Sequence, residues 1–265
     1  MRLSATRLRI TSGAAGRSFD TNARSYIAAV EAADGQTLET NVKIAINNFV
    51  VGCKNDGNWN AIKASCILSG ARTLSGALVP LVGTAPTNNN FVSGDYDRKT
   101  GLIGNGSTKY LDSNRANNAD PQNSKHVAMF ISSWDPLVPR SLMGANPLES
   151  GRFEFERNPS SGTTNLYVST ATALSPATAT PTQFLGATRT GASAFNARIL
   201  GVAYSGTTTS STPTATTLHI FRRNFSGDLG VTARLAFYSI GESLDLALLD
   251  TRITALITAF GVVIP

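Results

Sequence analysis

RLAFYSIGESLDLALLDTRITALITAF, residues 234–260, places a strand directly before an amphipathic helix. Arg234–Ile240 has the aromatic and branched content typical of a strand. Apolar residues then recur at three- and four-residue steps and form one helical face: Leu246, Leu249, Ile253, Leu256 and Ile257. Ser243 can cap this helix, and Gly261 is expected to end it after Phe260. The stretch therefore predicts a closing helix over residues 243–260.

Upstream of this stretch, residues 67–242 contain many short alternating segments separated by Gly and Asn clusters. This rhythm is typical of an antiparallel β-sandwich or jelly roll. The expected strands are His126–Ser132, Ser141–Gly144, Arg152–Arg157, Asn165–Ser169, Ala197–Tyr204, Thr217–Arg222 and Arg234–Ile240. Residues 170–182 are rich in Ala, Thr and Pro, which predicts a long exposed loop. We expect residues 67–265 to form the sandwich domain with its closing helix.

Residues 20–66 are expected to form a helical region for attachment or packing. The first helix begins at an N-cap, Asp20, and ends at the pair Asp34-Gly35. A second helix, residues 37–53, carries an apolar stripe of Leu38, Val42, Ile46, Phe49 and Val50. A short third helix is expected to hold Trp59 in the core, together with Ile62 and Lys63. Because each helix has one apolar stripe, we expect the helices to pack on the sandwich.

Positive charge is concentrated in an N-terminal arm, residues 1–19. Charged residues make up only 15% of the chain, against about 25% in ordinary soluble domains. Residues 1–24 supply four of the six net positive charges, because Arg2, Arg7, Arg9, Arg17 and Arg24 face a single acid, Asp20. A basic arm can bind nucleic acid or a protein surface. We favour an anchor on protein, because Leu8 and Ile10 alternate with Arg7 and Arg9 as in an edge-adding strand.

The two cysteines, Cys53 and Cys66, form no disulfide framework and are expected to be buried free thiols. Residues 1–19 lack the apolar core of a signal peptide. No apolar run was expected to reach the length that spans a membrane, so neither membrane insertion nor a nucleic-acid partner is predicted. No phosphate-binding loop motif is present.

Two segments carry a resemblance to known domains. Gly104-Asn105-Gly106-Ser107-Thr108-Lys109-Tyr110-Leu111 resembles a strand that opens concanavalin A-like and laminin-G jelly rolls, and residues 234–241 resemble their closing strand. With residues 26–81, which begin YIAAVEAADGQTLETNVKIAINNFVVGCK, these segments are similar to virion proteins of tailed bacteriophages. The resemblance covers residues 23–115 and 230–258, and reaches residues 116–230 only by general pattern.

The resemblance implies a mainly β protein with a concanavalin-like sandwich, assembled in a host cytoplasm into a virion. The expected function is a structural tail- or fibre-associated surface protein whose lectin-like domain attaches to a host-surface glycan. The implied partners are other virion proteins and further copies of the chain. A head decoration protein without a ligand is the alternative, and a glycan hydrolase is a third.

The candidate ligand-binding residues are Trp134, Asp135, Arg152 and Glu154. Trp134 could be an aromatic platform flanked by Asp135, or a packed loop anchor. Glu154 and Glu156 lie on one strand face at i, i+2 spacing, as a hydrolase carboxyl pair would. We instead expect an acidic face neutralised by Arg152 or a neighbouring strand. With two ordinary strand histidines, His126 and His219, the sequence predicts no enzyme.

A calcium site is the one cofactor to consider. Asp95, Asp97 and Asp112 lie in segments rich in oxygen ligands, and calcium takes six to eight oxygens. Concanavalin-like domains often bind calcium near their ligand face. The alternative is turn and cap chemistry, which Asp, Ser and Asn favour without a metal. The sequence thus predicts no obligatory cofactor.

Overall fold

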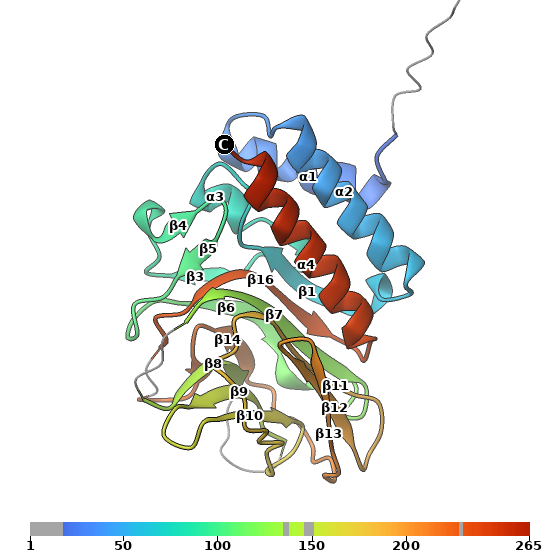
Figure 1. The fold of residues 1–265 in the computed structure, drawn as a ribbon, viewed down its shortest axis with the longest axis vertical. Coiled ribbons are helices and arrows are strands. Elements are labelled where there is room, and N and C mark those ends of the chain that lie inside the picture. Colours follow the sequence, from blue (N-terminus) through green and yellow to red (C-terminus); the bar gives the residue numbers. More distant parts are fainter. Residues whose placement is uncertain (1–17, 135–137, 146–150, 228–229) are drawn as a thin grey trace, which may run out of the picture.

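The protein is a three-layer β-sandwich in the computed structural model, which describes residues 18–134, 138–145, 151–227 and 230–265. Two antiparallel sheets face each other, and helices cover the outer face of the larger sheet (Figure 1). This confirms the predicted mainly β sandwich with N-terminal helices and a C-terminal helix. The basic arm residues Arg2, Arg7, Arg9 and Arg17 lie outside the described residues.

Two helices, α1 (Thr21–Asp34) and α2 (Thr40–Asn55), open the described chain. Asp20 caps α1 as predicted, because its side chain accepts a hydrogen bond from the Asn22 amide. Gly35 ends α1 with a left-handed backbone (φ 67°), which costs glycine little. The second helix begins later than expected, at Thr40.

The predicted short third helix is wrong. A single 3₁₀ turn, Trp59–Ala61, leads directly into strand β1 (Ile62–Ile67). Five of the six residues of β1 are buried, so its sequence lacks the alternation that separates a strand from a helix. The expected boundary between helical region and sandwich, at residue 66, therefore falls inside a sandwich strand.

The larger sheet has nine strands. Its main order is β13-β12-β11-β7-β16-β1-β2, and β5 joins it through β16 and β4 through β5. The bounds are β2 (Pro80–Val82), β4 (Tyr96–Asp97), β5 (Gly101–Ile103), β7 (Lys125–Ser133), β11 (Gln183–Arg189), β12 (Phe195–Ile199), β13 (Val202–Gly206) and β16 (Arg234–Gly241). The short helix α3 (Leu74–Ala77) lies between β1 and β2 in the chain.

The smaller sheet has seven strands in the order β10-β9-β8-β14-β6-β3, and β15 pairs with β8. The bounds are β3 (Thr87–Asn89), β6 (Tyr110–Ala116), β8 (Arg140–Ala145), β9 (Phe153–Asn158), β10 (Thr163–Val168), β14 (Thr217–Ile220) and β15 (Arg223–Asn224). Two short 3₁₀ turns, Ser93–Asp95 and Asn117–Ala119, interrupt the connections. The loop at residues 170–182 has isolated bridges to β10 rather than a strand of its own.

The single strand expected at Ala197–Tyr204 is a hairpin of β12 and β13. Leu200 and Gly201 both have positive φ (51° and 77°), as the two central residues of a type I′ turn require. Leucine rarely adopts this conformation, so the turn has little signal in the sequence. Strand β11, which pairs with β7 and β12, is absent from the strands predicted from the sequence.

Two hydrophobic cores flank the nine-stranded sheet. The inner core lies between the sheets and contains Phe153, Phe155 and Leu185. The outer core lies under the helices, where Phe49 of α2 meets Phe237 of β16 edge-on, with ring centroids 5.6 Å apart. Both cysteines are free and buried, as predicted.

The closing helix, α4 (Leu246–Val263), differs from prediction at both ends. Asp245, not Ser243, is the N-cap, because its carboxylate accepts hydrogen bonds from the Ala247 and Leu248 amides. The helix also continues through Gly261. The predicted apolar face, from Leu246 to Phe260, is buried in the outer core.

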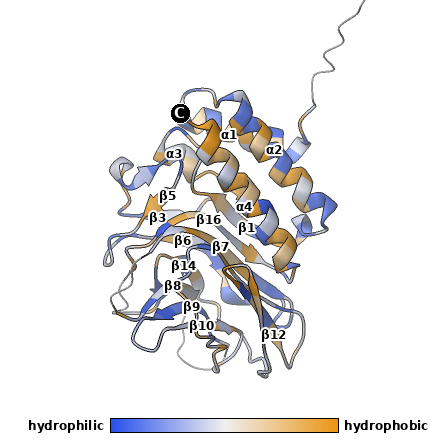
Figure 2. Ribbon diagram, in the orientation of Figure 1, coloured by the Kyte–Doolittle hydropathy of each residue, from blue (hydrophilic) through white to orange (hydrophobic). Residues whose placement is uncertain are grey.

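The expectation that no apolar run reaches membrane-spanning length is wrong for α4. Its 18 residues are long and apolar enough to cross a membrane by length and composition, and Figure 2 shows hydrophobic residues running along it. The core helix of a soluble protein meets the same test. Here one side of α4 packs on the sheet and on α2, so its apolar character has a use within the fold.

His126 of β7 is a fully buried histidine held by two hydrogen bonds. Its Nδ1 donates to the Glu242 carbonyl at 2.5 Å, and its Nε2 accepts from the Ser239 hydroxyl at 2.7 Å. Burial lowers the pKa of His126 from 6.5 to about 4. The ring is therefore neutral at pH 7.

Replacing His126 should flatten the acid stability profile. The unfolded chain binds the His126 proton below pH 6.5, whereas the folded chain binds it only near pH 4, so stability falls between these values. We expect the wild type to lose about 2 kcal/mol more than His126→Gln between pH 7 and pH 4.5. Urea unfolding at several pH values measures this difference, and parallel curves for the two proteins would contradict it.

Candidate functional site

Trp134 is a core residue and not an exposed platform. It follows β7, is 8% exposed and belongs to the core between the sheets. Of the two roles considered for it, the packed anchor fits the structure, because a ligand cannot stack on a buried ring. Its expected partner, Asp135, lies outside the described residues.

Arg152 and Glu154 lie on the outer face of the seven-stranded sheet and bind each other. Glu154 is 1% exposed, and its carboxylate accepts hydrogen bonds from Ser141 Oγ, from Arg152 Nε and, at 3.2 Å, from Arg223. The Arg152 guanidinium also lies 3.7 Å from the centre of the Tyr167 ring. A ligand for these residues would have to displace contacts that already satisfy them, so their binding role stays a prediction.

A polar row crosses this same sheet face. Strand register places Tyr167 opposite Glu154, Glu154 opposite Gly144, Gly144 opposite His219, and His219 opposite Asp112. Sequence spacing could not reveal the row, because each member comes from a different strand.

His219 lies in the middle of the row and stacks on Tyr110 with ring centroids 4.6 Å apart. Burial lowers the pKa of His219 to about 4. On the same face, Glu156 accepts a hydrogen bond from Asn165 at 3.1 Å. The carboxylates of Glu154 and Glu156 are thus held by different neighbours rather than by one another.

The three candidate calcium ligands are not brought together. Asp95 pairs with Lys109, and Asp97 accepts three hydrogen bonds from Lys99 and Thr100 within its own turn. Asp112 belongs to the other sheet, where Thr217 donates to it. The described part of the chain contains no group of three or more His, Cys, Asp or Glu that could hold a metal ion. The turn chemistry considered as the alternative accounts for these residues.

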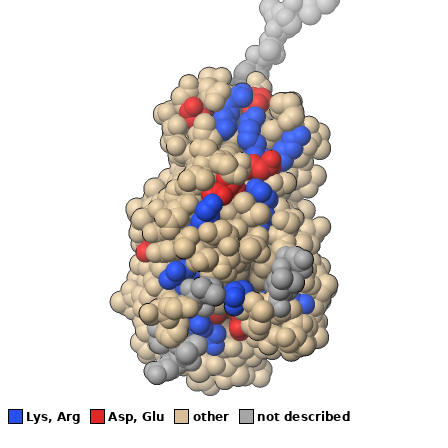
Figure 3. Space-filling view, turned by 90° about the vertical axis from the view of Figure 1, so that its left-hand side faces the viewer, with Lys and Arg blue, Asp and Glu red and all other residues tan. Residues whose placement is uncertain are grey.

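Charges on the described domain are largely interspersed. Figure 3 shows basic and acidic side chains side by side along one face of the molecule. Ion pairs include Lys43 with Glu31, Arg98 with Glu39, and Lys109 with Asp95. This agrees with the expectation that the excess positive charge belongs to the arm.

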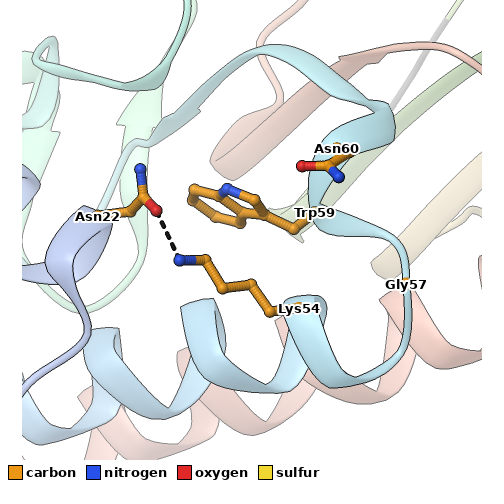
Figure 4. A pocket seen from close by; sticks show the side chains of 5 residues that line it. All are labelled: Asn22, Lys54, Gly57, Trp59 and Asn60. Atoms are coloured by element: carbon orange, nitrogen blue, oxygen red, sulfur yellow. Dashed lines mark hydrogen bonds between the residues drawn. The ribbon is translucent and has the colours of Figure 1, made fainter.

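An open pocket of about 460 Å³ lies where the start of α1, the end of α2 and the 3₁₀ turn meet. Figure 4 shows its lining, which consists of Asn22, Lys54, Gly57, Trp59 and Asn60. Trp59, which the sequence placed in the core of a helix, is only partly buried and contributes its indole to the wall. We refer to this cavity as the Trp59 pocket.

Lys54 crosses the Trp59 pocket and is held in place. Its Nζ lies 2.8 and 2.9 Å from the two Asp20 carboxylate oxygens and donates to Asn22 Oδ1 at 2.6 Å. The same ammonium is 5.6 Å from the centre of the Trp59 ring. The hydrogen bond from Lys54 lowers the pKa of Asp20, so the pair is charged at neutral pH.

The chemistry of the Trp59 pocket suits a sugar ring. A pyranose has an apolar C–H face, which can lie on an indole, and a rim of hydroxyls, which need donors and acceptors. The amides of Asn22 and Asn60 offer both, and binding sites commonly combine an aromatic wall with a few polar groups.

Comparison with known proteins supports the fold. The sequence matches no protein-family model and no curated protein. Among solved structures, it resembles a Trypanosoma rangeli sialidase in complex with 2-keto-3-deoxy-D-glycero-D-galacto-2,3-difluoro-nononic acid, with 10% identity and a TM-score of 0.52. It also resembles the binding domain of botulinum neurotoxin serotype D, with 12% identity and a TM-score of 0.50.

Each of these matches covers most of this chain but only part of the other. The sialidase match covers 82% of this chain and 39% of the sialidase. The neurotoxin match covers 74% of this chain and 52% of the binding domain. At such identities, the likeness shows the shared β-sandwich fold alone.

The prediction that the chain is not an enzyme is contradicted by this comparison. We predicted no enzyme because the sequence contains few residues that could form a catalytic motif. The fold nevertheless matches part of a sialidase chain. A sandwich of this kind thus gives no ground for excluding glycan hydrolysis.

Replacing Trp134 should destabilise the protein more than replacing Trp59. Trp134→Ala leaves a cavity between the sheets and should lower the free energy of unfolding by about 3–5 kcal/mol. Trp59→Ala removes a partly exposed ring and should cost about 1–2 kcal/mol. Chemical denaturation of both variants tests this difference, and equal losses would show that the Trp59 ring is as deeply packed as that of Trp134.

Proposed function

We propose that this protein binds carbohydrate through the Trp59 pocket. The observation that carries the proposal is a partly exposed indole facing two side-chain amides and a fixed lysine in an open cavity. The pocket needs little reorganisation, because Asp20 and Asn22 already hold Lys54. Such preorganisation lowers the entropic cost of binding.

The comparisons support this proposal through the fold. One matched structure is a sialidase bound to a nonulosonic-acid compound, and another is the binding domain of a neurotoxin. This chain would use the same architecture to recognise a glycan. Its own residues, rather than theirs, define the ligand.

We further propose that the glycan lies on a host surface and that the chain is a component of a tailed-phage virion, at the tail or fibre. Support comes from the sequence resemblance over residues 26–81, 104–111 and 234–241. Immunogold labelling of intact particles tests the position. Label on the head alone would favour a decoration protein, and absence of label from purified particles would refute the virion role.

Removing the indole should weaken glycan binding. A glycan array with the wild type identifies ligands, and calorimetry then measures affinity. We expect Trp59→Ala to weaken binding about tenfold or more, because aromatic contact contributes on the order of 1 kcal/mol beyond simple burial. Trp59→Phe should retain part of the affinity, since it keeps an aromatic face.

Tyr204→Ala is a matched control, because it removes an aromatic ring from a different surface. It should bind glycan as the wild type does. Loss of affinity in Tyr204→Ala but not in Trp59→Ala would place the site elsewhere. Absence of any ligand on the array at high protein concentration would refute the lectin role.

Glycan hydrolysis is a second candidate, favoured by the structural match to a sialidase. Its carboxyl pair would be Glu154 and Glu156 on the outer face of the smaller sheet. Each glycan that binds should be incubated with wild type, Glu154→Gln and Glu156→Gln, and the products followed by mass spectrometry. Cleavage lost in either variant would establish the activity, and intact glycan with the wild type would dispose of it.

A further inference from the structure

The outer edge of β13 has no partner strand. β13 ends the nine-stranded sheet and pairs only with β12. In the two-residue hairpin, Val202 and Ile199 form the first hydrogen-bonded pair, so the backbone groups of Ala203 and Ser205 point away from β12. No described strand lies on that side.

This edge also lacks the usual protection against pairing. Natural sheets blunt their edges with charged residues, proline or bulges. The β13 sequence, VAYSG, contains no charge and no proline, and its pairing with β12 has no register shift. Val202 is 52% exposed, and Tyr204 beside it on the same face is only partly buried. The edge is suited to accept another strand.

A pocket of about 390 Å³ adjoins this edge on the helix-covered side of the sheet. Its floor includes Ala203, Ser205 and Arg198, whose guanidinium is paired with Asp250. Its wall is the segment from Leu244 to Ala247 at the start of α4. Asp245 in this wall is exposed. Its carboxylate accepts hydrogen bonds from two backbone amides of α4, and no ion pair joins it to a cation in the described part of the chain. The pocket therefore offers a negative charge next to an open strand edge.

One segment of this chain matches both features. In Arg7-Leu8-Arg9-Ile10, arginines alternate with apolar residues, so an extended backbone would present the two kinds to opposite faces. Added beside β13, Arg7 and Arg9 would face the pocket and Asp245. Leu8 and Ile10 would then face Val202 and Tyr204.

We propose that residues 7–10 of one copy add as a strand to β13 of a second copy. A neighbouring copy is favoured because α1, which follows the arm, and β13 lie at opposite ends of the long axis of the molecule (Figure 1). Backbone hydrogen bonds to Ala203 and Ser205 would provide affinity, and the alternation of the arm would fix its register. The arm thus links copies of the protein to one another.

Light scattering of the full chain tests whether the arm joins copies of the protein. We expect a species larger than a monomer at tens of micromolar, and a monomer for Leu8→Asp with Ile10→Asp. Ala203→Pro should have the same effect, because it removes an outward N–H while sparing the pairing with β12. Val262→Thr is the control and should leave the oligomer intact, because Val262 is exposed near the C-terminal end of α4, away from β13. Circular dichroism and melting temperature verify that each variant is folded.

A labelled peptide of residues 5–12 provides a second measurement. It should bind the monomeric Leu8→Asp, Ile10→Asp variant saturably, whereas a scrambled peptide should not. Asp245→Asn should weaken the peptide several-fold and reduce its dependence on salt.

Three results would overturn the proposal. One is a monomeric wild type whose arm peptide still binds the variant, which would put the arm on its own edge. Another is an oligomer unchanged in a folded Ala203→Pro variant. The third is failure of the arm peptide to bind at all, which would leave the edge to a different partner.

Discussion

Strand β16 belongs to both hydrophobic cores, and the rest of the fold depends on this. Leu235 and Tyr238 face the core between the sheets, whereas Ala236 and Phe237 belong to the core under the helices. A register shift between Leu235 and Phe237 lets neighbouring residues share a side. A strand that is apolar on both faces must be covered on both. The helices are therefore a structural requirement of the larger sheet.

The contacts that hold the helical layer together also position the turn that carries Trp59. Arg252 of α4 forms a bidentate ion pair with Asp56 at the end of α2. Next to it, Asn58 exchanges two hydrogen bonds with the backbone of Asp245 at the start of α4. Trp59 follows Asn58 directly, so the turn that presents the indole is fixed by the same contacts that hold the helices on the sheet. Fold stability and the geometry of the proposed site are thus coupled.

Sequence predicted the elements whose signals are local. The caps of α1, the stripe of α2 and the face of α4 follow from residues three or four apart, and the buried residues of strand β10 alternate along the strand. Prediction failed where burial on both faces removes alternation, as in β1 and β11. It failed again at Leu200, where the hairpin context imposes a backbone that leucine seldom adopts. These features are set by tertiary contacts.

The same reasoning explains why the sequence left the role of Trp134 open and why the core position predicted for Trp59 was wrong. Trp134 follows a strand and precedes Asp135 and Pro136, which is the sequence setting of an exposed loop. Its ring nevertheless fills the space between the sheets. Trp59 has apolar neighbours at helical spacing, yet the chain turns at this point and leaves the ring beside Lys54. Exposure depends on where the chain reverses direction relative to distant elements. Asn22 and Lys54 meet across 32 positions to form one side of the pocket, so its ligand groups become visible only once the helices are packed.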